Sequence, residues 1–236
     1  MQDSVLIETR NLVKIYSSGA NKVVALDDVT LSFRKGEFAG LVGPSGSGKT
    51  TLLNIIGTLD VPTRGSARVL GEKVEELSHK RAAYLRNRYI GFVFQTFNLL
   101  PVYTVYENVE FPLLLLGIPA GERKQRVLRA LEWVGLQDKV HARPAQLSGG
   151  QSQRVAIARA MVKEPEIVIA DEPTANLDAK NSHNILQTMQ RLNRDLRTTF
   201  VFSTHDEKVI RYLHRKISLV DGRVAADETI VQDGGS

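Results

Sequence analysis

A glycine-rich octapeptide carries residue types that bind phosphate. It consists of Gly43, Pro44, Ser45, Gly46, Ser47, Gly48, Lys49 and Thr50, and it fits the phosphate-loop pattern. Glycines allow backbone N–H groups to turn toward a phosphate, a helix N-terminus after the loop adds partial positive charge, and Lys49 adds a full charge. The hydroxyl of Thr50 is suited to hold Mg²⁺. The alternative is a glycine-rich turn that matches by accident, and the strand-like run before it and the helical pattern after it argue against that alternative.

Two adjacent carboxylates, Asp171 and Glu172, follow the apolar run Ile167 to Ala170 and precede Pro173. In an open α/β sheet the ligand crevice lies beyond the carboxyl ends of the strands. We therefore expect Asp171 to face the phosphate loop and to bind Mg²⁺ through a water molecule. Glu172 is then placed to polarise a water molecule that attacks a phosphoryl group. An acidic turn before a proline is the alternative, and the phosphate loop in the same chain favours the catalytic interpretation.

A third segment, Leu-Ser-Gly-Gly-Gln, places two glycines at the start of a predicted helix. Ser148 followed three residues later by Gln151 is a capping box, and the helix that it opens is expected to run to Met161. Gly149 and Gly150 are unusual in a first turn, because glycine costs a helix interior about 1 kcal/mol relative to alanine. They are explained if the backbone there touches a ligand. The serine hydroxyl, the bare N–H groups and the helix dipole then form a second anion site.

Length and composition are those of a globular protein. The chain has 236 residues, of which 42% are apolar and 24% charged, and it has no cysteine, which excludes disulfides and thiolate metal sites. Residues 1–10 do not resemble a secretory signal, and the longest apolar stretch, 111–118, is far shorter than the roughly 20 residues of a transmembrane helix. The net charge of +5 fits nucleotide, nucleic acid or anionic lipid as a partner, or simply a well-solvated surface. The glycine-rich end after Gln232 is expected to be disordered.

Hydrophobic periodicity predicts strands that alternate with helices, which is typical of a parallel sheet. Strands are expected at 5–12, 23–33, 38–42, 90–94, 167–170 and 199–202, with a hairpin formed by 217–220, Asp221-Gly222 and the segment from Val224 onward. A helix is expected at 49–59, after the phosphate loop. Two further helices are expected to bury one face each, made of Val127, Leu128, Leu131 and Val134 and of Ile185, Leu186, Met189, Leu192 and Leu196. The mostly helical segment 104–161 is a candidate subdomain.

Taken together, the three motifs resemble those of the ABC ATPase family, whose signature motif matches Leu147–Gln151 without a change. The resemblance covers nearly the whole chain. It implies an α/β fold in which a P-loop NTPase core with a mostly parallel sheet carries an N-terminal antiparallel β subdomain and an inserted helical subdomain. The whole chain would be one domain, with 1–94 and 162–236 forming the RecA-like core and the β subdomain and 95–161 forming the helical subdomain.

The resemblance also implies the activity, which is hydrolysis of ATP in the presence of Mg²⁺. In this family the signature motif of one subunit closes on the γ-phosphate that the phosphate loop of the other subunit holds. Because the chain has a single copy of each motif, a second copy of the chain or a similar ATPase subunit is expected as a partner.

The family pattern assigns roles to four further residues. Tyr16 follows the first expected strand, where relatives place an aromatic ring against adenine; Gln95 senses Mg²⁺ and the attacking water; His205 hydrogen-bonds the γ-phosphate; and Asp178 lies in the loop through which the two subunits sense each other. As isolated residues, Tyr16 and His205 are also explained by surface packing and by a hydrogen-bonded histidine at a strand end. The expected catalytic residues are Lys49, Gln95, Glu172 and His205, and the expected metal-binding residues are Thr50, Gln95 and Asp171. The expected nucleotide contacts are Tyr16, Gly43, Pro44, Ser45, Gly46, Ser47, Gly48, Lys49, Thr50, Thr51, Gln95, Ser148, Gly149, Gly150, Gln151, Asp171 and Asp178.

Three short segments resemble the lipoprotein-releasing and macrolide-exporter group of the family: Asn54–Asp60, Tyr89–Gln95 and Asn98–Pro101. This likeness implies integral membrane permease subunits as partners, a peripheral position on the cytoplasmic face of the inner membrane, and no nucleic acid partner. Two alternatives are open: a cell-division-type relative that regulates wall hydrolases, and a soluble ABC ATPase that acts on DNA or the ribosome. Proteins of the latter kind usually carry two cassettes or a long coiled-coil insertion. A kinase that uses the phosphate loop alone is disfavoured by the signature motif.

Overall fold

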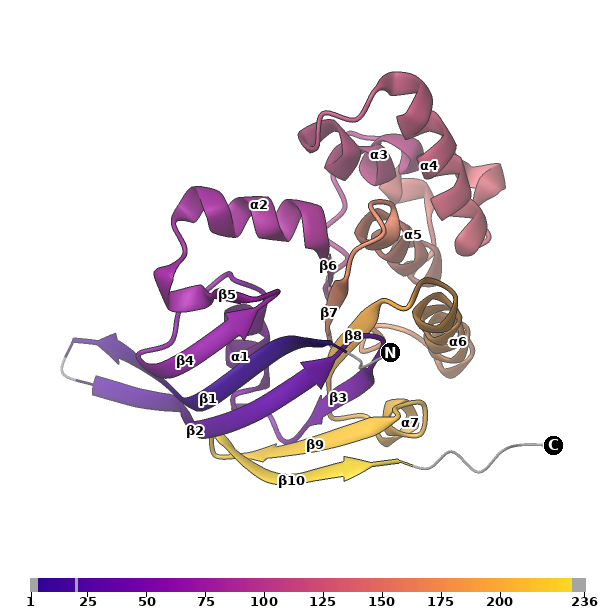
Figure 1. Cartoon of the computed structure of the whole chain (residues 1–236). Coiled ribbons are helices and arrows are strands. Elements are labelled where there is room, and N and C mark those ends of the chain that lie inside the picture. The colour runs from indigo at the N-terminus through magenta and orange to yellow at the C-terminus, as the bar shows by residue number, and fades with distance from the viewer. Residues whose placement is uncertain (1–3, 20, 231–236) are drawn as a thin grey trace. The chain divides into compact units, whose positions relative to one another are not determined.

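Two long antiparallel strands, β1 (Val5–Ser18) and β2 (Asn21–Arg34), come first in the computed structural model (Figure 1). The structure describes residues 4–19 and 21–230, so the expected disorder after Gln232 lies outside the described residues. The chain divides into two compact units, the first made of residues up to Arg86 and from Thr199 onward, the second of Asn87–Thr198. The predicted helical segment 95–161 lies within the second unit.

The first unit contains an antiparallel sheet with the strand order β2-β1-β4-β5, completed by β4 (Arg64–Val69) and β5 (Glu72–Lys73). The C-terminal half of β2 alternates between buried and more exposed residues, as a strand with one face in a core does. Leu26, Val29, Leu31 and Phe33 are its buried residues. The predicted strands at 5–12 and 23–33 are therefore confirmed, although β1 extends well beyond its predicted end.

A second set of strands in the first unit surrounds β3 (Phe38–Val42), which pairs in parallel with β8 (Thr199–Thr204) and with β9 (Arg215–Val220). β3 and β8 are buried along nearly their whole length, as the apolar runs 38–42 and 200–202 predict, and the flanking Thr199, Ser203 and Thr204 of β8 are buried as well. β10 (Arg223–Thr229) pairs antiparallel with β9 across Asp221 and Gly222, which both have positive φ. This is the two-residue turn that suits a twisted hairpin, and the predicted hairpin is confirmed.

The helical elements of the first unit are short. α1 (Lys49–Ile56) ends at Ile56 with Gly57 as its C-cap, and Leu59 is half exposed, so the predicted helix to Leu59 was too long. The chain turns there because Thr58 adopts a positive φ of 57°. α2 (His79–Tyr89) runs across the division between the units. The remaining helical elements are α7 (Glu207–Ile210) and the 3-10 turn η1 (Val74–Glu76).

The second unit contains the parallel strand pair β6 (Ile90–Val93) and β7 (Ile167–Asp171) together with four helices. The helices are α3 (Val105–Leu115), α4 (Ala120–Trp133), α5 (Gly149–Met161) and α6 (Ala179–Leu196), and the 3-10 turns are η2 (Gln137–Lys139) and η3 (Pro144–Gln146). α5 contacts α3, α4, α6 and β6, so it forms the centre of this unit (Figure 1). The predicted buried faces of α4 and α6 are confirmed, with the exceptions of Leu128, which is 41% exposed on α4, and Leu196, which is partly exposed at the end of α6.

Among the described residues, no helix combines the length and the apolar composition that crossing a bilayer requires.

Candidate nucleotide-binding site

The phosphate loop folds around the side chain of Lys49. Its ammonium Nζ donates hydrogen bonds to the backbone carbonyls of Gly43, at 2.7 Å, and Pro44, at 2.9 Å, and the residue is only 7% exposed. The N–H of Ser47 donates to the Pro44 carbonyl at 3.2 Å, which closes the loop on itself. The positive charge is thereby held inside the loop, at the start of α1, where a phosphate would meet both the ammonium and the helix N-terminus.

Two glycines of this loop are required by the backbone. Gly46 and Gly48 have φ angles of 81° and 98°, a region that residues with a side chain rarely adopt. A Cβ atom at Gly48 would also lie 2.4 Å from the carbonyl oxygen of Ala25. Ser47 adds a buried hydroxyl for which the described part of the chain provides no hydrogen-bond partner. A glycine-rich loop with a buried ammonium and a hydroxyl that has no protein partner among the described residues offers donors to a bound phosphate.

The β9–β10 hairpin supports the loop from outside. The N–H of Gly222 donates to the Ser47 carbonyl at 3.1 Å, and a Cβ atom at Gly43 would lie 2.2 Å from the carbonyl oxygen of Leu219. Sequence reasoning had identified this hairpin but gave it no role at the loop. No local pattern could have revealed that role, because the contacting residues of the loop and the hairpin lie more than 170 positions apart in the sequence.

His205 leaves the sheet beside the phosphate loop. Val42, the last residue of β3, is the register partner of Thr204, the last residue of β8. Because β3 and β8 run parallel, Gly43 and His205 emerge at the same edge of the sheet. His205 is exposed there, as a residue that meets a ligand must be.

Tyr16 lies within β1 and not after it, so the predicted position was wrong. The strand continues to Ser18 because its pairing with β2 extends to that residue. The ring is 42% exposed, and its hydroxyl donates a 2.8 Å hydrogen bond to Asp60 Oδ2. Burial and this hydrogen bond raise the pKa of the Tyr16 phenol, while a hydrogen bond with the Thr51 hydroxyl opposes the rise. These contacts place Tyr16 next to α1, one turn from Lys49.

The carboxylates of the second unit sit at the end of β7. Asp171 is the last residue of the strand, and Glu172 has a φ of 47°, which is unusual for a residue with a side chain. Gln153 of α5 is fully buried, and its Nε2 donates a 2.5 Å hydrogen bond to the carbonyl of Pro173. Sequence reasoning missed Gln153, although a polar residue in the otherwise apolar middle of a buried helix is a usable signal.

The predicted capping box at the start of α5 is confirmed. The Ser148 hydroxyl accepts from the Gln151 N–H at 3.3 Å, and the Ser148 N–H donates to Gln151 Oε1 at 2.9 Å. The two glycines differ in their surroundings. A Cβ atom at Gly150 would lie 2.5 Å from Asn181 Oδ1, whereas a Cβ at Gly149 would meet its nearest neighbour at an ordinary 3.7 Å. Packing within the unit therefore explains Gly150 but not Gly149, which is exposed.

Asp178 caps the N-terminus of α6. Its carboxylate accepts from the backbone N–H of Asn181 at 2.8 Å and from the Asn181 side-chain Nδ2 at 2.7 Å. Both hydrogen bonds lower the pKa of the Asp178 carboxyl, and the bond from the backbone N–H has the larger effect. In the same loop, Nδ2 of Asn176 donates to the carbonyl of Gln95 at 3.0 Å. The loop that carries Asp178 thus touches both the signature segment, through Asn181, and the segment after β6.

Gln95 lies two residues after the end of β6, on an exposed loop. The next residues, Phe97 and Asn98, both have positive φ, of 59° and 48°. Arg159 of α5 holds this strained backbone by donating to the Phe97 carbonyl at 2.7 Å and to the Asn98 carbonyl at 2.5 Å. Burial lowers the pKa of the Arg159 guanidinium. Sequence reasoning missed Arg159, which fixes the loop that presents Gln95.

The predicted site residues fall into two groups, one in each unit. The first group lies in the first unit, where α1, β3 and β8 link its members. It consists of Tyr16, the phosphate loop with Thr50 and Thr51, and His205. Gln95, the signature segment, Asp171, Glu172 and Asp178 belong to the second unit, where α5 and α6 link them. In the described part of the chain, no three His, Asp or Glu side chains gather closely enough to hold a metal ion by themselves.

A parallel-stranded sheet with a phosphate loop at its carboxyl edge defines the class of P-loop nucleotide-binding proteins. The model of the family described as "ABC transporter" matches residues 26–175. The chain is 47% identical, over 95% of its length and 100% of the relative's, to the lipoprotein-releasing system ATP-binding protein LolD of Geobacter metallireducens. It is 43% identical to the macrolide export ATP-binding/permease protein MacB of Hyphomonas neptunium, with 94% of this chain matching 34% of that protein. The chain belongs to the ABC transporter family, as an ATP-binding subunit with ATPase activity.

A solved structure supports the same family assignment. The dimeric structure of the ATP-binding cassette MJ0796, in a post-hydrolysis state bound to ADP and Pi, superimposes with a TM-score of 0.88 at 42% identity, covering 98% of this chain and 100% of that chain. The predicted fold class, with its antiparallel N-terminal sheet, is therefore confirmed. So is the predicted resemblance to the LolD and MacB group.

Proposed function

We propose that the chain binds MgATP on the phosphate loop and hydrolyses it as one half of a dimer that drives a membrane permease. The observation that carries the proposal is the loop itself, in which the carbonyls of Gly43 and Pro44 hold the buried Lys49 ammonium at the N-terminus of α1. A buried cation next to a helix N-terminus binds a polyphosphate more readily than any neutral ligand.

The proposed roles of the binding residues follow from their chemistry. Lys49 and the backbone N–H groups of the loop bind the β- and γ-phosphates, and Tyr16 stacks on adenine through its exposed ring. Bound Mg²⁺ would neutralise charge on the phosphates, with Thr50, Gln95 and Asp171 as the protein groups that hold it, directly or through water.

Hydrolysis is proposed to use three further side chains. Glu172 accepts the proton of the attacking water, and it lies directly after β7 with a positive φ of 47°. Gln95 orients the same water. His205 donates a hydrogen bond to the γ-phosphate, where negative charge spreads over the phosphoryl oxygens as the bond to the leaving group breaks.

The second copy is proposed to supply the signature segment. Ser148 and Gly149 are exposed at the N-terminus of α5, and packing within the second unit does not account for Gly149. An exposed helix N-terminus with bare N–H groups suits the γ-phosphate of a nucleotide bound to a partner. The MJ0796 cassette, which carries ADP and Pi, is dimeric. Asp178 is proposed to lie at the same contact between subunits.

A membrane permease is the proposed output partner. MacB is described as an ATP-binding/permease protein, and this chain spans about a third of its length. The segment 100–115 in the second unit exposes large apolar side chains, which are Leu100, Val102, Tyr103, Leu114 and Leu115. We assign these to the contact with the permease, which would hold the chain as a peripheral protein on the cytoplasmic face of the inner membrane. Lipoprotein release and macrolide-type export are the candidate tasks.

The variant Glu172→Gln tests the hydrolysis and dimer proposal together. Because it keeps the side-chain volume but removes the base, it is expected to bind ATP, to lose about two orders of magnitude or more of ATPase rate, and to elute as a dimer when ATP and Mg²⁺ are present. The parent protein with ADP is the control and is expected to elute as a monomer. A Glu172→Gln protein that binds ATP but stays monomeric would contradict the shared site.

A further inference from the structure

The carboxylate of Asp60 bridges the side chains of Lys14 and Tyr16. Its Oδ2 accepts the Tyr16 hydroxyl at 2.8 Å, and its Oδ1 accepts the Lys14 ammonium at 2.5 Å. Lys14 and Tyr16 are two residues apart on β1, so their side chains lie on the same face of the sheet. One carboxylate therefore binds the two neighbours on that face.

The ammonium of Lys14 also packs against one face of the Tyr16 ring. Lys14 is 8% exposed, its Nζ also donates to the Val61 carbonyl at 2.8 Å, and it lies 4.9 Å from the centroid of the Tyr16 ring. Such a cation over an aromatic face is attractive. With the ammonium against one face of the ring and the hydroxyl fixed at its tip, the Tyr16 side chain has little freedom to rotate.

Asp60 itself is anchored to α1. Its N–H donates to the Asn54 carbonyl at 3.2 Å, and its Oδ1 accepts the N–H of Val61 at 2.7 Å. Burial raises the pKa of Asp60, but the hydrogen bonds from Lys14 and Tyr16 outweigh that effect, so the net pKa is lower than usual and the group is ionised at neutral pH. Since α1 begins at Lys49, the bridge links the orientation of the Tyr16 ring to the helix that carries the phosphate loop.

We propose that Asp60 is a positioning residue for adenine recognition, which holds the Tyr16 ring at a fixed place relative to the phosphate loop. The inference rests on the proposed stacking of Tyr16 on adenine. A ring that is already immobilised loses less entropy when the base stacks on it. Asp60 would therefore act on the affinity for the base and leave the affinity for the phosphate chain unchanged.

The test compares ATP with inorganic tripolyphosphate, which has no base, by isothermal titration calorimetry on the full chain with Mg²⁺. Three variants separate the steps. Tyr16→Ala removes the ring, Tyr16→Phe keeps the ring but removes its hydrogen bond to Asp60, and Asp60→Asn keeps the shape but removes the charge. Tyr16→Phe leaves the Lys14–Asp60 ion pair in place, so it remains informative if Asp60→Asn folds poorly. Thermal unfolding of each variant monitors the fold.

Tyr16→Ala is expected to weaken ATP binding by about ten- to a hundredfold, the usual range for loss of a base stack. Tyr16→Phe and Asp60→Asn are each expected to weaken it by about three- to tenfold, in line with one lost hydrogen bond. Tripolyphosphate should bind all four proteins equally. If Tyr16→Ala weakens ATP binding while Tyr16→Phe and Asp60→Asn do not, the role of Asp60 is wrong and the stacking stands. If Tyr16→Ala has no effect, the stacking itself fails. An equal loss for tripolyphosphate in Asp60→Asn would also overturn the inference.

Discussion

Asn181 of α6 occupies the space that a side chain at Gly150 of α5 would need, with its Oδ1 at 2.5 Å from the Cβ position. Asn181 is itself held by the Asp178 carboxylate through its backbone N–H and its side-chain amide. The start of the signature helix is thus packed directly against the cap of the next helix. The two glycines of the motif consequently serve different purposes, one inside the unit and one at its surface.

The first prediction separates these purposes. Gly150→Ala is expected to lower the free energy of unfolding by about 1–3 kcal/mol, because the added methyl group overlaps Asn181. Gly149→Ala is expected to change stability by less than about 0.5 kcal/mol and yet to reduce the ATPase rate by about tenfold or more, because its methyl group covers N–H groups that would meet a phosphate. Urea unfolding and phosphate release on both variants provide the comparison. Equal effects of the two substitutions on stability would show that the surroundings of the two glycines do not differ as described.

The second prediction concerns the buried amide of Gln153, which holds the Pro173 carbonyl next to Glu172. Gln153→Met preserves most of the volume but removes the donor, so the direction of the Glu172 carboxylate should become less well defined. We expect kcat to fall by about tenfold, in line with one lost hydrogen bond, with KM for ATP nearly unchanged. Gln187→Met, at an exposed position of α6, is the matched control. A rise in KM with an unchanged kcat would count against this positioning role.

The third prediction concerns the phosphate loop. Lys49→Ala removes a buried ammonium that donates to two loop carbonyls, and ATP affinity is expected to fall by about ten- to a hundredfold. The fold should persist by circular dichroism, because the apolar residues of α1 are retained. Lys80→Ala, at an exposed position of α2, removes the same charge elsewhere and controls for net charge. Unchanged ATP affinity in Lys49→Ala would refute the proposed phosphate contact.

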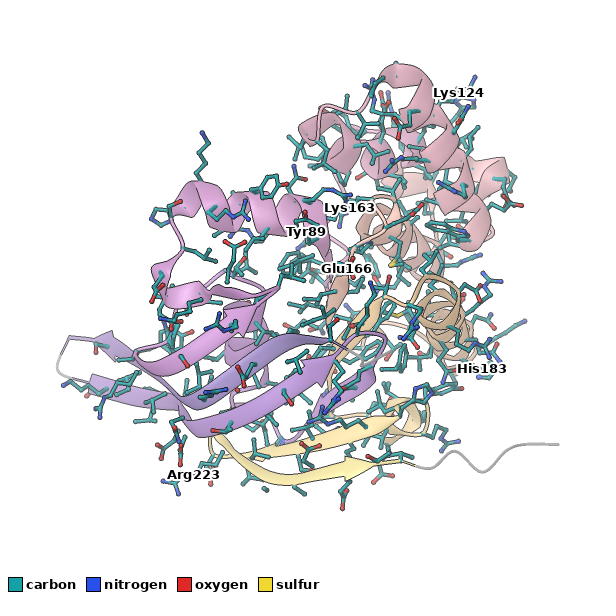
Figure 2. The ribbon with its side chains drawn as sticks, viewed as in Figure 1. Tyr89, Lys124, Lys163, Glu166, His183 and Arg223 are labelled. Atoms are coloured by element: carbon teal, nitrogen blue, oxygen red, sulfur yellow. The ribbon has the colours of Figure 1, made fainter. Side chains whose placement is uncertain are left out.

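The fourth prediction concerns pH and a buried lysine outside the nucleotide site. Lys163, labelled in Figure 2 together with Tyr89 and Glu166, donates to the Asn87 carbonyl at 2.7 Å, and burial lowers the pKa of its ammonium from 10.5 to about 7. Between these two values the unfolded chain holds a proton that the folded chain has lost. The contribution of Lys163 to the free energy of unfolding therefore rises with pH across this window, by about 1.4 kcal/mol per pH unit.

Urea unfolding between pH 7 and pH 10 measures this contribution. The parent should gain stability relative to Lys163→Met as the pH rises over that range. It should not gain stability relative to the control Lys124→Met, because Lys124 is exposed on α4 (Figure 2). Parallel curves for the parent and Lys163→Met would show that Lys163 keeps an ordinary pKa.

Sequence reasoning located the elements whose patterns are strong. β3, β7 and β8 are each built around a short apolar run, and the capping box at Ser148 uses local hydrogen bonds that a sequence can specify. It missed α2, because that helix is mostly polar and buries only Leu85, so it has no apolar stripe. It also missed β4, whose residues Arg64 and Gly65 do not resemble a strand and whose place depends on pairing with β1.

The motif residues of the candidate site were identified from the sequence, but the residues that hold them were not. Arg159, Gln153 and Asn181 act through contacts with residues 20 or more positions away, and their patterns alone say nothing of those partners. The extent of β1, and with it the place of Tyr16, depends on pairing with β2 and could not be read from alternation that fades after Leu12.

α5 is buried along nearly all of its length and exposed only at its tip. Amide protons in such a helix exchange with solvent only when the surrounding unit opens, whereas those of the first turn exchange from the folded protein. Deuterium uptake at residues 148–151 would therefore fall when a partner covers the N-terminus of α5, while uptake in the remainder of the helix stays low throughout. Because the rest of α5 is buried, exchange at its N-terminus would report the proposed contact with a second copy of the chain.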